Sequence, residues 1–328
     1  MITAVSRTNF HHLALFARLK KIGPAALTGL TMAVLVFAMT ATAGAQQSFK
    51  TVAEAADALL NAVKSGDQRG ILAVLGTDGA GIASSGDKVE DAAARKRFTD
   101  AYDAKHQINM EGEQKAVLVI GDQDWPFPIP IVRKDDSWRF DTAAGREEIL
   151  DRRVGRNELA AIQACLAYVD AQNDYAELMR ASTGTAAYAQ RIVSQPGKKD
   201  GLYWPTGPGE IASPLGELVA SATTEGYRVE GGHAPFHGYY YRILTRQGPA
   251  AHGGAYDYIA HGKMIGGFAL VAYPAVYRNS GVMTFLVNHE GTVFEKDLGP
   301  HTANIAEHLA SFNPDDTWKK VTIEAPDQ

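Results

Sequence analysis

Histidines are the residues of this chain that could most readily support chemistry. Ten occur in 328 residues, and six of them lie between positions 233 and 301. His233, His237 and His252 are candidate ligands for zinc or copper, since imidazole suits both metals. Pro235 prevents one helix from presenting His233 and His237 on the same face, and no His-Glu-x-x-His motif occurs. The sequence therefore predicts no cofactor and no metal site, with these three histidines as weak candidates.

Two other patterns could support hydrolysis. Ser85 to Lys88 (SGDK) matches the Ser-x-x-Lys nucleophile motif of exported penicillin-binding enzymes, but the companion Ser-Asp-Asn and Lys-Thr-Gly motifs are absent. Ser, Gly and Asp before a charged helix are also ordinary capping residues. Glu295 and Asp297 share one face of a predicted strand, as a carboxylate pair for glycoside hydrolysis would. Such acids usually face solvent, so the sequence favours a protein without catalytic activity.

Aromatic residues indicate a different chemistry, the binding of a partner. Rings can stack on sugars, and tyrosine is favoured at protein interfaces. Our leading hypothesis is therefore a non-catalytic module that binds an envelope protein or cell-wall glycan such as peptidoglycan. The alternative is a periplasmic hydrolase or metal-binding protein that uses the histidine-bearing loops. The binding candidates are Tyr203, Trp204, His233, His237, Tyr239, Tyr241, Arg242, Tyr256 and Asp257.

Residues 1–45 have the features of a secretory signal peptide. Four cations precede an apolar run of about 16 residues, and Ala43-Gly44-Ala45 forms a small-residue cleavage site. An uncleaved anchor is the competing interpretation, but a bilayer span needs roughly 20 apolar residues. We therefore expect cleavage, a periplasmic location, and no membrane span in the mature chain.

The net charge argues against nucleic acid as a partner. The leader contains four positive charges and no acid, so its removal changes the formal net charge from −5 to −9. Such a surface repels nucleic acid and anionic lipid. Cys165 is the only cysteine, and an internal disulfide is therefore impossible.

The mature chain is predicted to hold two α+β domains. In residues 46–142 the sequence pattern predicts helices followed by an antiparallel sheet, a layout that resembles the nuclear-transport-factor-2-like fold. Residues 143–156 form a charged connector. A long helix begins at Asn157, a good N-cap residue, within a second domain over 157–328. That helix should pack on an antiparallel β-meander, with a tight turn at His289-Glu290-Gly291.

Two family resemblances accompany this pattern. Asn157-Glu158, Gly238-Tyr239, Ala272-Tyr273-Pro274 and Gly281 to Phe285 resemble the soluble heads of type IV pilin-like proteins, which implies a pilin-head fold for residues 157–328. In pilins, however, an apolar stem precedes the helix, whereas a soluble domain precedes it here. The segments WPFPIPIV, WRFDTAAGREEIL and VFEKDLGP are similar to a family of exported bacterial proteins classed as a domain of unknown function. That resemblance implies an envelope location and supplies no reaction or site.

Overall fold

A computed structural model describes residues 45–228 and 234–322. The predicted leader, apart from Ala45, and the candidate His233 lie outside the described residues. Helices precede a sheet in the N-terminal part, and a long helix precedes antiparallel strands in the C-terminal part, so the predicted α+β class is confirmed. No helix within the described ranges is long and apolar enough to cross a membrane.

The N-terminal part packs helices on one face of an antiparallel sheet. The strand order is β1-β2-β4-β5, with β3 also paired to β2. Leu118 and Ile120 point from β2 into the same core as Leu59 and Ile71 from the helices. The elements are α1 (Val52–Ser65), α2 (Gln68–Leu75), a 3-10 turn (Thr77–Gly79), α3 (Ala80–Ala83), α4 (Lys88–Ala104), β1 (His106–Met110), β2 (Lys115–Ile120), β3 (Trp125–Pro126), β4 (Ile131–Lys134) and β5 (Ser137–Phe140).

One continuous helix, α5 (Thr142–Thr183), follows the first sheet. The prediction of a helix beginning at Asn157 is therefore wrong. Asn157 lies inside α5, where its side chain is buried and donates to Ser280 O at 2.8 Å. Gly155 also lies inside α5, because an internal glycine costs only about 1 kcal/mol and buried contacts flank it on both sides. Gly184, with a φ of 76°, ends the helix instead.

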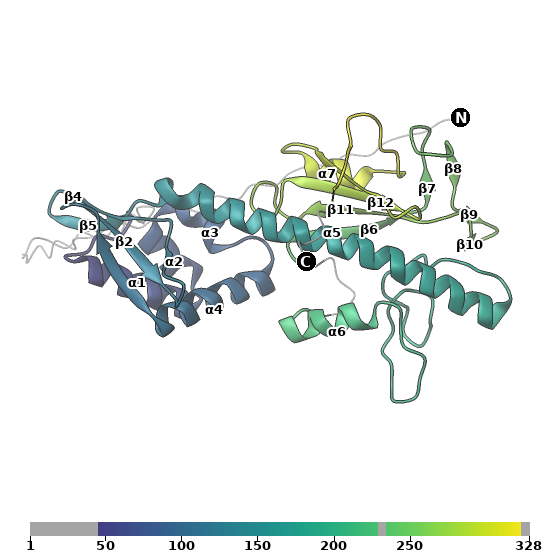
Figure 1. The fold of residues 1–328 in the computed structure, drawn as a ribbon, viewed down its shortest axis with the longest axis horizontal. Coiled ribbons are helices and arrows are strands. Elements are labelled where there is room, and N and C mark those ends of the chain that lie inside the picture. The colour runs from purple at the N-terminus through teal and green to yellow at the C-terminus, as the bar shows by residue number, and fades with distance from the viewer. Residues whose placement is uncertain (1–44, 229–233, 323–328) are drawn as a thin grey trace, which may run out of the picture. The chain divides into compact units, whose positions relative to one another are not determined.

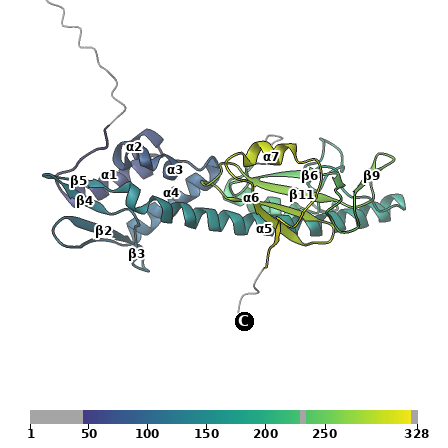
Figure 2. The same cartoon turned by 90° about the horizontal axis from the view of Figure 1, so that it is seen from above.

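The C-terminal part is built on a five-stranded antiparallel sheet of order β14-β13-β12-β11-β6. β11 lies between β6 and β12 (Figure 1), and the sheet lies between α5 and α7 (Figure 2). The predicted meander on a long helix is thus present. Its strands and helix are β6 (Tyr239–Leu244), β11 (Ala269–Pro274), β12 (Met283–Asn288), β13 (Val293–Asp297), α7 (Thr302–His308) and β14 (Lys319–Lys320).

The sheet buries one set of side chains against α5. Phe285 and Val287 share a core with Cys165 and Tyr168 of that helix, and Tyr168 Oη donates to Ala269 O at 3.2 Å. The turn at residues 289–291 joins β12 to β13 as predicted, with Gly291 at a φ of 76°. The remaining elements are α6 (Gly216–Glu225), β7 (Arg246–Gln247), β8 (Tyr256–Asp257), β9 (Ile259–Ala260) and β10 (Lys263–Met264).

Candidate functional site

Four of the aromatic binding candidates pack into the C-terminal core. Trp204 is 4% exposed, and its Nε1 donates to Ile211 O at 3.2 Å. Tyr239 is fully buried, with its hydroxyl donating to a main-chain carbonyl of β12. Tyr203 and Tyr241 are half-buried against the same core. These rings therefore do not form an exposed platform on which a sugar could stack.

Arg242 lies apart from these rings. Side chains alternate between the two faces of β6, so Arg242 points toward α7 whereas Tyr239 and Tyr241 point toward α5. Its Nη2 donates to Ala306 O and Leu309 O, both at 2.7 Å. Arg242 thus satisfies the carbonyls at the end of α7, a structural role.

The histidine candidates for a metal site have separate acidic partners. His237 Nε2 lies 3.4 Å from a Glu225 carboxylate oxygen, and His252 Nδ1 lies 2.7 Å from Glu290. Within residues 45–228 and 234–322, no group of three metal-ligating side chains is placed to hold an ion. The structure therefore brings neither His237 nor His252 into a metal-binding cluster.

The last two candidates, Tyr256 and Asp257, lie on the short strand β8. Tyr256 is 37% exposed, and Asp257 forms an ion pair with Arg246 at 3.4 Å. The register pairs Arg246 with Asp257 across β7 and β8. This cross-strand pair holds a small hairpin together.

Asp87 caps the start of α4, in agreement with the interpretation of Ser85 to Lys88 as residues at a helix start. Ser85 is buried, and its hydroxyl donates to Asp87 O at 3.4 Å. The Asp87 carboxylate accepts from the main-chain N–H groups of Val89 and Glu90 at the start of α4. The same carboxylate accepts from Tyr227 Oη at 2.8 Å, so it also ties α4 to the C-terminal part.

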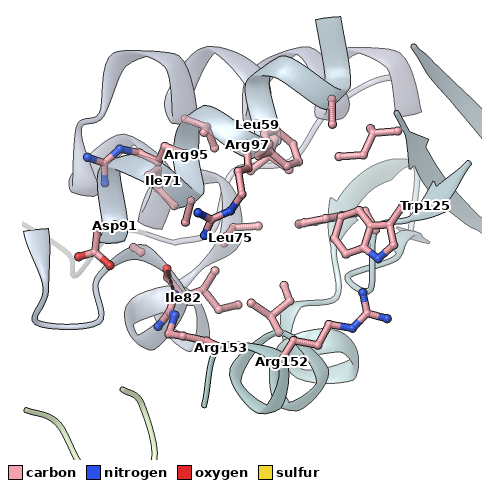
Figure 3. Close-up of a pocket in the computed structure, with 18 of the residues that line it drawn as sticks. Leu59, Ile71, Leu75, Ile82, Asp91, Arg95, Arg97, Trp125, Arg152 and Arg153 are labelled. Atoms are coloured by element: carbon pink, nitrogen blue, oxygen red, sulfur yellow. Dashed lines mark hydrogen bonds between the residues drawn. The ribbon is translucent and has the colours of Figure 1, made fainter. Parts of the chain in front are cut away.

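A cavity of about 290 Å³ lies between α4 and α5, in a place that sequence reasoning did not single out. Its walls come from the helices α1 to α5 and from the end of the first sheet (Figure 3). The interior is apolar, and the mouth is rich in arginine. The apolar lining includes Leu59, Val63, Ile71, Leu75, Ile82, Phe98, Ile120, Trp125, Phe127 and Ile149.

Two helices supply the guanidinium groups at the mouth. Arg97 of α4 donates to Glu90 Oε1 at 2.6 Å, and Arg156 of α5 approaches the same oxygen at 4.0 Å. Arg152 pairs with Glu148 at 2.5 Å and lies 5.3 Å over the Trp125 ring. Since the side chains of Arg97, Arg152 and Arg156 are about half exposed, their remaining N–H donors can reach a ligand.

Arg153 also lines the cavity, but its guanidinium group is already hydrogen-bonded within the protein. It is 6% exposed, and it donates to Gly81 O at 2.6 Å, to Ile82 O at 2.9 Å and to Asn279 Oδ1. Asp91, the only acid in the lining, accepts from Ser84 and Ser85. These bonds fix the wall near Ile82 and leave Arg153 few donors for a ligand.

The mouth carries an excess of positive charge. Burial lowers the pKa of Arg156 below its ordinary value, and the nearby Arg97 cation lowers it further. Glu90 acts in the opposite direction and Arg152 lowers the pKa again. Because a lowered pKa means that the cation is disfavoured, a bound anion would stabilise Arg156.

A spacing pattern could have revealed this site. Ile149, Arg152, Arg153 and Arg156 recur at three- and four-residue intervals and therefore share one face of α5. The sequence interpretation placed them in a charged connector, itself expected to be helical, and did not ask what this face of the connector contacts. On α4, Ala94, Phe98 and Ala101 repeat in the same way with Arg97 beside them, so both patterns mix apolar residues with arginine on one face.

A family model described as "Protein of unknown function (DUF2950)" matches residues 46–321. The chain belongs to the DUF2950 family. This assignment confirms the resemblance to a family classed as a domain of unknown function. Comparison with curated proteins and with solved structures found no match, so the pilin-head resemblance stays a prediction.

Proposed function

We propose that this DUF2950 protein is an exported, non-catalytic binding protein whose cavity between α4 and α5 holds a small amphiphile with an anionic head group. The observation that carries the proposal is the group of Arg97, Arg152 and Arg156, here called the arginine ring, beside an apolar cavity lining. Figure 3 shows Arg97 and Arg152 with part of that lining. An apolar interior favours burial of a hydrocarbon group. Guanidinium groups bind carboxylate and phosphate oxygens, often through two parallel hydrogen bonds.

The volume of the cavity limits the size of the ligand. At about 290 Å³ it lies at the lower end of the range for small-molecule sites, which is roughly 300–1,000 Å³. A water-sized group occupies about 30 Å³, so the cavity holds roughly ten such groups. This size supports one short acyl chain or one aromatic group and argues against a whole diacyl lipid.

The charge balance of the site favours an anion. The lining contains five arginines and Asp91, and Glu90 and Glu148 pair with arginines of the mouth, which leaves two positive charges in excess. An anionic head group would neutralise part or all of this excess. A neutral head group would leave the arginine donors to water.

The lining supports binding rather than catalysis. Its titratable side chains are five arginines and Asp91. Arginine cannot act as a base at neutral pH because its pKa is above 12. Asp91 accepts hydrogen bonds from Ser84 and from Ser85 N. The lining therefore offers no activated nucleophile and no free base.

Export is supported by the sequence at the chain's start. Residues 1–45 have the charge, apolar run and cleavage site of a leader. The family match begins at Gln46, the residue after the predicted cleavage point. A periplasmic location follows from these two observations as part of the proposal.

Calorimetric titration of the purified protein with sodium decanoate and with 1-decanol tests the proposed function. We expect decanoate to bind at least tenfold more tightly than decanol, because hydrogen bonds to charged groups contribute about 1.5–3 kcal/mol. Arg97→Gln combined with Arg156→Gln should reduce decanoate affinity about 10- to 100-fold. Arg133→Gln is the matched control, since Arg133 lies on β4, outside the lining, and pairs with Asp136.

The apolar part of the site needs its own variant. Ile149→Trp places a larger side chain in the cavity wall and should abolish binding of both ligands. Equal affinity for decanoate and decanol would refute the arginine ring as the recognition element. Unchanged binding in Ile149→Trp would refute the cavity as the site.

A further inference from the structure

Among the described residues, strand β6 is an edge strand of the C-terminal sheet. It pairs with β11 on one side only. Main-chain groups of successive residues in a strand point alternately to its two sides. Tyr239 exchanges main-chain hydrogen bonds with Phe236, at 2.9 and 3.1 Å, on the side away from β11. The N–H and C=O groups of Tyr241 and Ile243 therefore point to that outer side as well.

These four outward groups have no partner in the described parts of the chain, residues 45–228 and 234–322. The opposite edge of the sheet is protected, because β14 is only two residues long and both are lysines, Lys319 and Lys320. β6 has six residues, three of them tyrosines, and contains neither lysine nor proline. Its one charged residue, Arg242, is bound to main-chain carbonyls of α7 and Leu309, and the strand has no lysine or proline to hinder pairing with another chain.

A large cavity lies beside this edge. Its volume is about 900 Å³, and Tyr168 of α5, Leu218 and Val219 of α6, and Tyr241 and Leu270 of the sheet contribute to its walls. Tyr241 belongs both to the open edge and to the cavity wall. Since side chains of a strand alternate between its faces, a segment paired with β6 would direct every second side chain into this cavity.

The charged side chains in the cavity lining are those of Asp87, Lys88 and Arg228. Lys88 lines the cavity and is exposed, and it forms no ion pair with any residue that the structure describes. The neighbouring Asp87 carboxylate is already occupied, because it accepts from Val89 N, Glu90 N, Tyr227 Oη and Gly238 N. Charge complementarity therefore favours an acidic group on the occupant.

We propose that β6 and its neighbouring cavity bind an extended segment of another protein, apolar at alternate positions and carrying an acidic residue near Lys88. The segment would add a strand to the sheet through the outward groups of Tyr241 and Ile243, a known mode of peptide recognition. A small apolar ligand could fill the cavity but would leave those four groups unpaired. This site is separate from the arginine-rimmed cavity and takes a different class of ligand.

Two synthetic peptides, Ac-TVTVTE-NH2 and Ac-TVTVTK-NH2, test the proposal against the purified protein. We expect the glutamate peptide to bind at least threefold more tightly than the lysine peptide by isothermal titration calorimetry. Binding should slow hydrogen–deuterium exchange at the amides of Tyr241 and Ile243, which only strand addition protects. No binding of either peptide at millimolar concentration, or binding without this protection, would overturn the proposal.

A pair of variants isolates the main-chain contact. Ile243→Pro removes one outward N–H without removing a bond to β11, and proline is tolerated at such edge positions. Ile243→Ala removes the same side chain and keeps the N–H. We expect the proline variant to bind the glutamate peptide roughly three- to tenfold more weakly than the alanine variant. Equal affinity of the two variants contradicts the proposal, as does a dimer of the free protein that Ile243→Pro dissociates.

Discussion

Replacement of Arg153 by methionine should destabilise the protein by about 3–5 kcal/mol. The buried guanidinium group makes three hydrogen bonds, to Gly81 O, Ile82 O and Asn279 Oδ1. Each bond to a charged group contributes about 1.5–3 kcal/mol. Several kcal/mol of desolvation opposes this gain, consistent with the burial that lowers the pKa of Arg153. The difference between these terms gives the expected loss.

Urea denaturation followed by circular dichroism measures this loss directly. A chain of this length loses roughly 2–4 °C in Tm per kcal/mol, so the thermal midpoint should fall by about 6–20 °C. Arg152→Met is the matched control on the same helix. Arg152 is half exposed, with one ion pair to Glu148 and a cation–π contact to Trp125, and its loss should cost less than about 1 kcal/mol.

The comparison of the two variants tests whether the buried hydrogen bonds of Arg153 stabilise the protein more than the exposed contacts of Arg152 do. If Arg153→Met and Arg152→Met differ by less than about 1 kcal/mol, the three hydrogen bonds of Arg153 do not carry the stability assigned to them. A double variant, Arg153→Met with Asn279→Ala, should be less damaging than the sum of the two single variants, because both remove the same contact.

Two further predictions concern α5. Burial raises the pKa of Cys165 to about 12, so the thiol of the folded protein stays neutral at pH values where an unfolded thiol ionises. The free energy of unfolding should therefore fall as pH rises from about 9 toward 12, by up to about 1.4 kcal/mol per pH unit from this group. Denaturation of Cys165→Ala over the same pH range should show a shallower fall, and an equal slope in the two proteins would contradict this prediction. Gly155→Ala should raise the free energy of unfolding by about 0.5–1 kcal/mol, because alanine favours a helix interior and a Cβ at Gly155 meets no atom within 4 Å. A loss of stability in the same denaturation assay would contradict a continuous helix.

The β-meander was predictable because its signals are local. A continuous apolar run marks β11, and Met283, Phe285 and Val287 alternate along β12. Gly291 supplies the positive φ that the turn requires. The start of α5 was not predictable in the same way. Asn157 is a good N-cap residue and Gly155 a plausible stop, but buried contacts from Arg153 and Asn157 override both preferences. Tertiary contacts of this kind join residues more than 70 positions apart, which local patterns do not show.

The candidate site was less predictable than the fold. Tyrosine-rich β6 suggested an exposed binding face, yet Tyr239 is fully buried. Whether an aromatic ring faces solvent depends on which helix covers the sheet, and that depends on the whole fold. The arginine ring needed α4 and α5 to be placed side by side before its residues could be recognised as one set.

Because α5 is continuous, the residues that it contributes to the two cores have a fixed rotation relative to each other about the helix axis. Ile149 packs against the N-terminal core, and Ala161 and Cys165 belong to the C-terminal core. Each residue of an α-helix turns the chain by about 100° and advances it by about 1.5 Å. A one-residue insertion between Arg153 and Asn157 would therefore rotate one set of contacts away from its core while the other stayed in place. Insertions and deletions should be tolerated in the loops of this family but excluded from this segment of α5.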